Sequence, residues 1–233
     1  MQYPYFYEEN ILAEDKTFVL SEETSRHCVQ VLRMRSGSRL HLVNGRGLLV
    51  TASIAIADKK NTLINIESHT AHVAPPNKIH IAISLLKNIG RFEWFLEKAI
   101  EMGVQTITPL ICERTEKIQF RKDRMKQIVI SAMLQSRQTY LSVLNDPADY
   151  NHVVEKINEP KKFIAHCEKT AKKLLFDYSP VKDNAVILIG PEGDFTNTEI
   201  EKAFAAGFLP VSLGATRLRT ETAGVYSAVL LCK

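Results

Sequence analysis

Several features that assign a chain to a broad functional class are missing from this sequence. No C-x-x-C pair occurs, no histidine stands at metal-ligand spacing, and the few cysteines are scattered: Cys28, Cys112, Cys167 and Cys232. We expect these thiols to be reduced and packed as small hydrophobic groups, with no disulfide framework and no bound metal.

Long hydrophobic segments are also missing. No apolar run approaches the roughly 20 residues that a membrane helix needs. The N-terminal MQYPYFYEEN lacks the basic stretch and the apolar core of a signal peptide. These absences predict a cytoplasmic protein with no membrane partner.

Positive charge is in modest excess and is concentrated in one segment. The 233 residues are 45% hydrophobic and 24% charged, which is enough for a folded core, and the net charge is +4. Segment 114–126, RTEKIQFRKDRMK, holds six basic and two acidic residues, so it alone equals the excess of the whole chain. Either a solvated loop or contact with a phosphate backbone would explain this cluster.

Two regions differ in pattern and predict domains at 1–72 and 73–233. In the first, Ser21 can cap a helix that includes HCVQVLRM, and Asn44-Gly45 favours a type I′ hairpin. The residues that follow alternate onto one strand face: Leu48, Val50, Ala52, Ile54 and Ile56. Short strands with one helix predict a small β-barrel, and the proline-containing 69–77 predicts a linker.

In the second region strands alternate with helices. Apolar runs such as KIHIAISLL and AVILIG are typical of parallel strands covered on both faces. A helical stripe lies between strands and can end at Gly103: Phe92, Phe95, Leu96, Ala99 and Ile100. This alternation predicts an α/β domain with a mainly parallel sheet.

Ligands of open α/β sheets bind beyond the carboxyl ends of strands, and three such ends carry unusual residues: 166–168, 190–194 and 214–222. The second, GPEGD, is neither a Walker loop nor G-x-G-x-x-G, and Glu192 and Asp194 would repel phosphate. They would tolerate a positively charged ligand such as S-adenosylmethionine (SAM), with its sulfonium and ammonium groups. A plain strand-to-helix turn is the alternative interpretation.

The third strand end precedes an apolar helix. Thr220 or Thr222 can serve as its N-cap, and Glu221 would lie near the positive end of the helix dipole. A ligand contact can coexist with this capping role, because the start of a helix presents free N–H groups.

At these loops the chain resembles a known family. IGPEGDFTNTEI and LGATRLRTETA closely resemble the two signature loops of the bacterial 16S ribosomal RNA (uracil-N3)-methyltransferases, which belong to the SPOUT class. Upstream segments resemble that family in the same order, so the resemblance covers essentially the whole chain: HCVQVLRM, FEWFLEKAIEMGVQTITPLICERT and SAMLQSRQ. The chain departs from the family at Gln30, Leu134 and Asp194, where Arg, an EQ-containing run and Gly are usual.

The resemblance implies a fold and an activity. The fold is an N-terminal PUA-like β-barrel that binds RNA, followed by a SPOUT α/β domain with a trefoil-knotted parallel sheet. The activity is methyl transfer from SAM to N3 of a uridine in the 16S rRNA of the small ribosomal subunit, by a homodimer. By motif match, the residues that contact SAM are His166, Gly190, Pro191, Glu192, Gly193, Leu213, Gly214, Leu218, Arg219, Thr220 and Ala223.

Uracil N3 must lose its proton before it attacks the methyl group, so the enzyme needs a base and a group that stabilises negative charge. Arg219 is our candidate for the stabilising group, and Glu192 and Glu221 are the candidate bases, between which the sequence does not decide. The candidate rRNA contacts are basic residues that could equally be solvated surface charges: Arg33, Arg35, Arg46, Lys87, Arg91, Arg114, Lys117 and Arg137.

Other functions remain open at this point. One is a SPOUT methyltransferase that acts on a different rRNA or tRNA nucleotide. Another is an RNA-binding or ribosome assembly factor that kept the fold without catalysis. A nucleotide-binding α/β protein is disfavoured because the phosphate-binding loop is missing.

Overall fold

The computed structural model describes residues 3–116 and 119–232, which fold into two compact units. The N-terminal unit comprises Met1–Ala74 together with Met133–Leu141, and the C-terminal unit comprises Pro75–Ala132 together with Ser142–Lys233. Segment Met133–Leu141 therefore packs with the N-terminal unit, although the sequence pattern placed it in the C-terminal domain.

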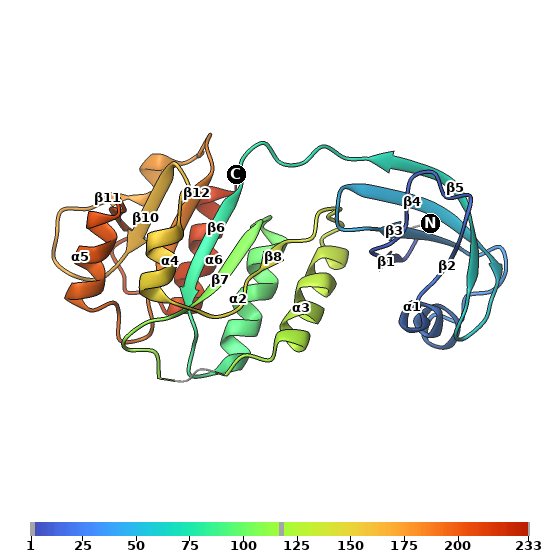
Figure 1. The fold of residues 1–233 in the computed structure, drawn as a ribbon, viewed down its shortest axis with the longest axis horizontal. Helices are drawn as coiled ribbons and strands as arrows, with labels where there is room; N and C mark the ends of the chain where they lie inside the picture. Colours follow the sequence, from blue (N-terminus) through green and yellow to red (C-terminus); the bar gives the residue numbers. More distant parts are fainter. Residues whose placement is uncertain (1–2, 117–118, 233) are drawn as a thin grey trace. The chain divides into compact units, whose positions relative to one another are not determined.

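A five-stranded sheet forms the N-terminal unit, in the order β1-β3-β4-β5-β2 (Figure 1). Its strands are β1 (Tyr5–Tyr7), β2 (Thr17–Val19), β3 (Arg39–Val43), β4 (Leu48–Ile56) and β5 (Leu63–Ala71). β1 pairs with β3 in parallel, and the other pairs are antiparallel. The sheet and the helical segment enclose an apolar core that includes Phe6, Leu20, Cys28, Leu42 and Val50.

The helix of this unit is shorter than predicted. Ser21 caps α1 (Glu22–Arg26) as expected, because its side chain accepts a hydrogen bond from the Thr24 amide. The α-helix then ends, and His27–Val31 forms a π-helical turn.

The β3–β4 connection also differs from the prediction. It spans 44–47 and is not a type I′ turn, because positive φ occurs at Gly45 and Gly47 and not at Asn44. The Asn44 side chain instead accepts hydrogen bonds from the amides of Arg46 and Leu48.

Two strand boundaries need correction as well. The alternation of β4 buries its inward side chains only as far as Ile54; Ile56 is 60% exposed, because the register with β5 shifts between them. β5 runs to Ala71, so the predicted linker begins later than His69.

Backbone hydrogen bonds fasten segment Met133–Leu141 to the β3–β4 connection. The Gly47 amide donates to the Thr139 carbonyl and the Leu141 amide donates to the Gly45 carbonyl, both at 2.9 Å. The Tyr140 hydroxyl donates to the His72 carbonyl, also at 2.9 Å. These bonds explain why the segment belongs to this unit.

The C-terminal unit is a parallel sheet in the order β11-β13-β10-β12-β6-β7-β8, with β9 on β7. Its strands are β6 (Ile79–Ser84), β7 (Thr106–Ile111), β8 (Val143–Leu144), β9 (Ala148–Asp149), β10 (Lys161–Ala165), β11 (Lys173–Leu174), β12 (Ala185–Ile189) and β13 (Leu209–Ser212). β6 and β12 are buried throughout, as expected for strands covered on both faces.

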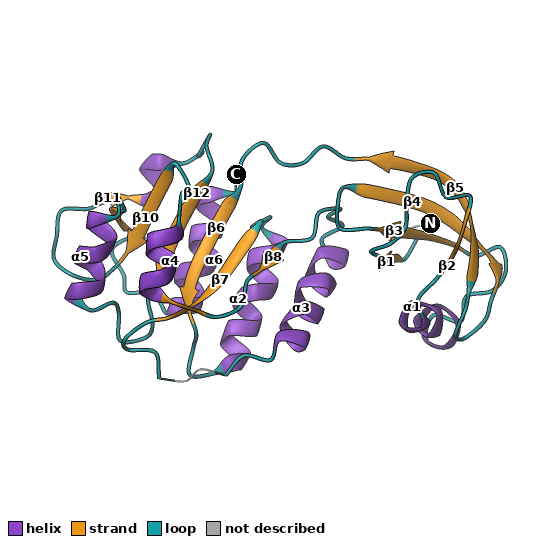
Figure 2. Cartoon of the chain, viewed as in Figure 1, coloured by secondary structure: helices purple, strands orange, loops and turns teal. Residues whose placement is uncertain are grey.

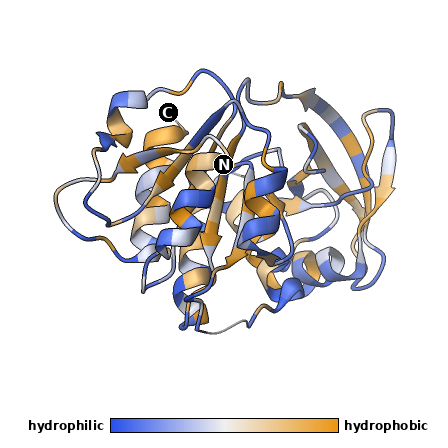
Figure 3. Ribbon diagram, turned by 60° about the vertical axis from the view of Figure 1, so that its left-hand side comes forward, coloured by the Kyte–Doolittle hydropathy of each residue, from blue (hydrophilic) through white to orange (hydrophobic). Residues whose placement is uncertain are grey.

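Helices cover both faces of this sheet (Figure 2). They are α2 (Ile89–Glu101), α4 (Tyr150–Lys156), α5 (Asn197–Ala205) and α6 (Thr220–Leu231), with a 3-10 turn at Leu175–Tyr178. A further helix, α3 (Lys122–Gln135), ends in the segment that packs with the N-terminal unit. The strands are strongly hydrophobic, whereas the outer turns of the helices are hydrophilic (Figure 3). This division places the apolar core between the sheet and its helical layers.

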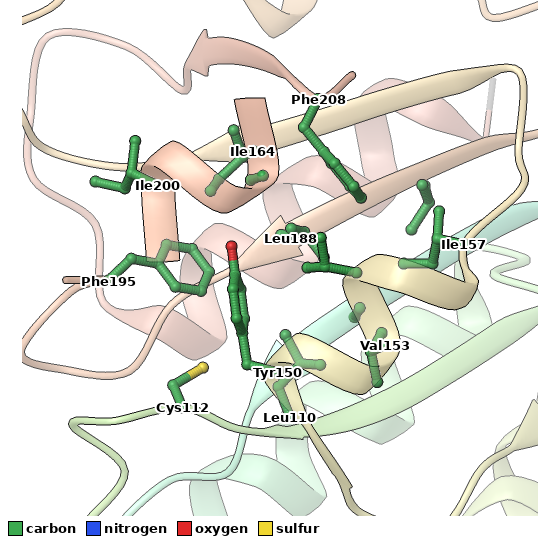
Figure 4. Close-up of a cluster of buried hydrophobic side chains, with 14 residues drawn as sticks. Leu110, Cys112, Tyr150, Val153, Ile157, Ile164, Leu188, Phe195, Ile200 and Phe208 are labelled. Atoms are coloured by element: carbon green, nitrogen blue, oxygen red, sulfur yellow. The ribbon is translucent and has the colours of Figure 1, made fainter. Parts of the chain in front are cut away.

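Each face has its own cluster. α4 and α5 pack Tyr150 and Ile200 against Leu188 on one face (Figure 4). On the other face α6 lies close to α2 and β6: a Cβ added at Gly224 would stand 2.5 Å from the Phe95 ring and 2.8 Å from Ile83. Thr196 and Glu199 form the predicted capping box in front of α5. None of the described helices is long and apolar enough to cross a membrane.

Gly47 should be the more costly of two left-handed glycines to replace. Gly47→Ala forces an L side chain to φ 94° and places its Cβ 2.8 Å from the His72 carbonyl oxygen. We expect a loss of about 3 kcal/mol in the free energy of unfolding, measured by urea titration. Gly37→Ala is the matched control, since φ there is 84° but nothing lies within 4 Å; it should cost about 1 kcal/mol. Equal losses of stability in the two variants would show that the close contact with His72 adds nothing to the cost of the left-handed φ.

Candidate functional site: a cavity beyond three strand ends

The strand ends singled out in the sequence meet at one cavity. β13, β10 and β12 are neighbours in the sheet, so the segments that leave their carboxyl ends lie side by side. Together they line a cavity of about 660 Å³. That size suits a ligand of drug-like or cofactor dimensions.

Most of the predicted cofactor-binding residues line this cavity: His166, Gly190, Pro191, Glu192, Leu213, Gly214, Leu218, Arg219, Thr220 and Ala223. Gly193 is the exception. Its carbonyl accepts a hydrogen bond of 2.7 Å from Arg114, and a Cβ added there would stand 3.3 Å from the Arg114 side chain. The contact of Gly193 with a cofactor stays a prediction.

A buried hydrogen bond joins two walls of the cavity. The Thr220 hydroxyl donates to the Gly190 carbonyl at 3.0 Å, which ties the start of α6 to the end of β12. This corrects the predicted capping role, because Arg219 occupies the N-cap position and makes no side-chain cap bond. The first turn of α6 therefore presents its amides without a side-chain cap, as an anion or a ligand carboxylate would require.

His166 is the clearest sign of a ligand. It is buried directly after β10, and both ring nitrogens lack a hydrogen-bond partner among the described residues. Its ring lies edge-on to Phe204, at 5.9 Å between centroids. Burial, and next the nearby Lys172 ammonium, lower the pKa of His166, so the ring is neutral at pH 7. A neutral imidazole offers one donor and one acceptor.

Asp194 holds the second loop in place. Its φ of 63° is left-handed, which Asp tolerates and Gly adopts without strain, and this explains how Asp stands where the family usually has Gly. Its carboxylate accepts hydrogen bonds from the Cys167 amide at 2.7 Å and the Phe195 amide at 2.8 Å. Asp194 thus links the loop after β12 to the loop after β10.

The cavity is also lined by residues that the sequence did not predict as site residues: Ala165, Cys167, Lys172, Ile189, Asp194, Val211, Ser212, Ala215, Thr216 and Arg217. Most are sequence neighbours of predicted residues. Lys172 is different, because its ammonium folds back to donate to the carbonyls of His166 at 2.6 Å and Glu168 at 2.7 Å. No periodicity or motif in the sequence signals such a loop contact.

The candidate catalytic residues separate into two environments. Glu192 and Arg219 are exposed and line the cavity. Glu221 is buried and is not part of the lining; its Oε1 lies 3.7 Å from Arg91 Nε, and its Oε2 has no hydrogen-bond partner in the described chain. The structure therefore brings together Glu192 and Arg219, and it places Glu221 beside α2.

The predicted RNA-contacting residues divide between the units. Arg33, Arg35, Arg46 and Arg137 are exposed in the N-terminal unit. In the C-terminal unit Lys87 pairs with Glu116 at 2.7 Å, while Arg91 and Arg114 make the contacts given above. Lys117 lies outside the described residues.

The basic cluster of segment 114–126 is partly neutralised. Lys122 pairs with Asp146 at 2.7 Å, and the Arg124 Nη2 donates to Glu93 at 2.6 Å. Among the described residues, no group of three or more His, Cys, Asp or Glu side chains could hold a metal ion.

Comparison with known proteins identifies the family. An RNA methyltransferase domain model matches residues 73–231, and an RNA methyltransferase PUA domain model matches residues 20–67. The Ribosomal RNA small subunit methyltransferase E of Buchnera aphidicola is 32% identical over 239 residues, which cover 98% of this chain and 92% of that protein.

Solved structures agree along the whole chain. The Ribosomal RNA small subunit methyltransferase E of Neisseria gonorrhoeae, bound to S-adenosyl methionine, has a TM-score of 0.87 and 31% identity, over 97% of this chain and 95% of that one. A methyltransferase of Legionella pneumophila with bound SAM has a TM-score of 0.86 and 34% identity, over 98% and 96%.

These likenesses confirm the expected fold class, a SPOUT-type parallel-sheet domain preceded by a PUA-like domain. One domain model spans most of the chain, and the Buchnera relative exceeds 30% identity over nearly all of it. The chain belongs to the ribosomal RNA small subunit methyltransferase E family of RNA methyltransferases.

Proposed function

We propose that this protein, acting in the cytoplasm, transfers the methyl group of SAM to N3 of a uridine in the 16S rRNA of the small ribosomal subunit. The observation that carries the proposal is the cavity at the ends of β10, β12 and β13, lined by ten of the residues that the family motifs nominate. Relatives named for methylation of small-subunit rRNA, and relatives solved with SAM, support the substrate and the cofactor.

The residues present fit SAM. His166 leaves a neutral, buried donor and acceptor unpaired at the cavity wall, so a ligand with matching polar atoms would complete its hydrogen bonds. The lining carries two carboxylates, Glu192 and Asp194, and three cations, Lys172, Arg217 and Arg219, so it offers partners both for the positive groups of SAM and for its carboxylate. When bound, SAM supplies an electrophilic methyl group; the protein supplies position, polarity and proton handling.

The distribution of charge favours particular roles. Arg219 lines the cavity, and its guanidinium has no hydrogen-bond or ion-pair partner among the described residues, so it can stabilise negative charge on the uracil oxygens. Of the two candidate bases, Glu192 lines the cavity, whereas Glu221 faces Arg91. This arrangement favours Glu192 as the group that accepts the N3 proton.

A homodimer is part of the proposal. α2 and α6 pack against each other, and each exposes a large ring: Trp94 is 44% and Tyr226 is 40% exposed. Exposed aromatic side chains on adjoining helices are typical of protein interfaces.

Arg219→Ala should abolish most of the activity with little effect on folding. Removing a donor that stabilises developing charge typically lowers kcat by about 100-fold or more. The measurement is mass-spectrometric nucleoside analysis of 16S rRNA from cells that lack this gene and carry wild-type or variant copies. Arg26→Ala is the control, since Arg26 is an exposed arginine that does not line the cavity and pairs with Glu22 at 2.7 Å, and this variant should keep wild-type activity.

The same analysis tests the proposed function. Loss of 3-methyluridine in the deletion, restored by the wild type and not by Arg219→Ala, supports it. Loss of another methylated nucleoside instead would overturn the substrate, and no change in any RNA would favour a non-catalytic RNA-binding role.

His166→Ala should weaken SAM binding by about tenfold, because one buried hydrogen bond is lost.

The pH dependence of SAM affinity should follow the protonation state of His166. Burial lowers the pKa of His166, so the ring is neutral at pH 7 and at every pH above this lowered pKa. SAM affinity should therefore stay constant over that pH range. As the pH falls through the lowered pKa, the ring becomes a cation and repels the cationic ligand. Titration calorimetry at several pH values should show this decline in the wild type; a variant that declines equally would refute the assignment.

Trp94→Glu should convert the dimer into a monomer, because it replaces the exposed ring on α2 with a negative charge in the proposed interface. The measurement is size-exclusion chromatography with light scattering. The wild type should elute with twice the 26.3 kDa of the chain. Val143→Glu, at a 55% exposed position on β8, is the control and should stay dimeric. A wild type that elutes as a monomer would contradict the proposal.

A further inference from the structure

The N-terminal unit contains a shallow hollow that shares no lining residue with the cavity beyond the strand ends. It has a volume of about 450 Å³ and is lined by Tyr3, Pro4, Tyr5, Leu134, Gln135 and Arg137. One wall is the start of β1 and the other is the end of α3 with the turn that follows it. All of these residues belong to the same compact unit.

Three rings gather at the first wall. Tyr5 stands opposite His41 in the parallel pairing of β1 with β3, and their ring centroids are 4.7 Å apart at 53°. The Tyr3 ring lies 5.3 Å from the same His41 ring at 59°. Arg39 donates to the Tyr3 hydroxyl at 3.2 Å, and the His41 ring is hydrogen-bonded to the Thr51 hydroxyl at 3.1 Å. The tyrosines are thus held at the hollow by fixed neighbours.

The second wall carries a cation in an unusual backbone conformation. Arg137 has a φ of 56°, a left-handed value that costs about 1 kcal/mol or more for a residue with a Cβ. Such strain persists only where surrounding structure imposes it. Here the Arg137 amide donates to the Leu134 carbonyl at 3.2 Å and the Gln138 amide donates to the Met133 carbonyl at 3.0 Å.

The Arg137 guanidinium has no ion-pair or hydrogen-bond partner within residues 3–116 and 119–232, and it is exposed. Its positive charge and burial both lower the pKa of His41, burial more strongly, so His41 is neutral at pH 7 and adds no second charge. The hollow therefore combines aromatic faces, one amide side chain and one free cation.

We propose that this hollow binds an unstacked nucleobase of the RNA substrate, with Tyr5 and Tyr3 offering the stacking surface and Arg137 contacting the adjoining phosphate. The proposal rests on the proposed rRNA substrate and adds a recognition subsite in the N-terminal unit. Proteins bind single-stranded RNA by stacking splayed bases on aromatic side chains and by neutralising the backbone, which is the chemistry gathered here. Gln135 adds an amide that can pair with a base edge.

Rigid walls are what a stacking site requires. The turn that carries Arg137 continues into 139–141, which the hydrogen bonds to Gly45, Gly47 and His72 fasten to the sheet. The opposite wall is fastened by the His41 amide, which donates to the Pro4 carbonyl at 2.8 Å. Little conformational entropy is then lost when a base enters.

The test is fluorescence anisotropy of a labelled single-stranded oligouridylate with the full-length protein, without SAM, at several salt concentrations. Tyr5→Leu should weaken binding about tenfold without changing the salt dependence, because stacking releases no counterions. Tyr5→Phe keeps the ring and should bind within about twofold of the wild type. Arg137→Gln should weaken binding and reduce the salt slope by about 1, as expected for one lost phosphate contact.

Arg26→Gln is the matched control, since Arg26 is an exposed arginine of the same unit paired with Glu22 at 2.7 Å, and it should bind as the wild type does. Thermal unfolding by circular dichroism checks that Tyr5→Leu folds. Arg137→Gln alters an exposed side chain, so it tests the hollow even if Tyr5→Leu is unstable.

Several outcomes would overturn the subsite. If Tyr5→Leu and Arg137→Gln both bind RNA with wild-type affinity, the hollow does not bind the RNA. If Tyr5→Leu and Tyr5→Phe lose equal affinity, the Tyr5 hydroxyl makes the contact and the ring does not stack on a base. Variants that bind free RNA normally but lose affinity for isolated small subunits would point to a ribosomal protein as the occupant. The anisotropy assay needs no methyl transfer, so it tests the subsite separately from the proposed function. A wild type that forms no 3-methyluridine would contradict the proposed function. A loss of RNA affinity in the variants would still support the subsite.

Discussion

A single buried hydrogen bond holds together two walls of the cavity beyond the strand ends. The Thr220 hydroxyl and the Gly190 carbonyl, 3.0 Å apart, join the first turn of α6 to the carboxyl end of β12. Both groups are shielded from water, so leaving either unpaired would cost about 1–3 kcal/mol. The bond therefore holds the segment before α6 against the segment after β12, and the cavity lies between them and the end of β10.

The rest of α6 makes that position possible. Gly224 leaves room for the Phe95 ring and Ile83, so the helix can lie directly on α2 and β6. Ser227 satisfies its hydroxyl within the helix by donating to the Ala223 carbonyl at 2.8 Å. With the helix seated in this way, its first turn points uncapped amides and Arg219 at the site, while Glu221 is turned to Arg91. The same anchoring thus separates two carboxylates that are both close to the loops in sequence.

The N-terminal unit shows a second consequence of contacts between distant parts of the chain. Segment Met133–Leu141 follows a helix of the C-terminal unit, yet it is bonded to the β3–β4 connection through Gly45 and Gly47. A base-binding hollow can exist at β1 only because this segment supplies its other wall. Recognition and catalysis are therefore built from separate parts of the fold, each with a rigid frame.

The sequence alone determined the main buried elements, the family and most of the residues that line the cavity. Hydrophobic periodicity identified the buried parallel strands and the stripe of α2, because burial on one or both faces constrains residue type at every position of an element. The capping box at Thr196 was equally local. The loops IGPEGDFTNTEI and LGATRLRTETA indicated the family by resemblance, and they contain nine of the ten predicted residues that line the cavity; the tenth, His166, follows β10.

Tertiary structure decided what depends on partners far away in the chain. The π-helical turn after Arg26, the end of the alternation at Ile56 and the N-terminal membership of Met133–Leu141 all follow from pairing or packing that no local pattern encodes. Thr220 could cap a helix by its sequence position, but a carbonyl 30 residues away takes its hydroxyl. Which of Glu192 and Glu221 faces the cavity was undecidable for the same reason: side-chain direction at a helix start depends on how that helix is anchored, and only the folded chain fixes the anchor.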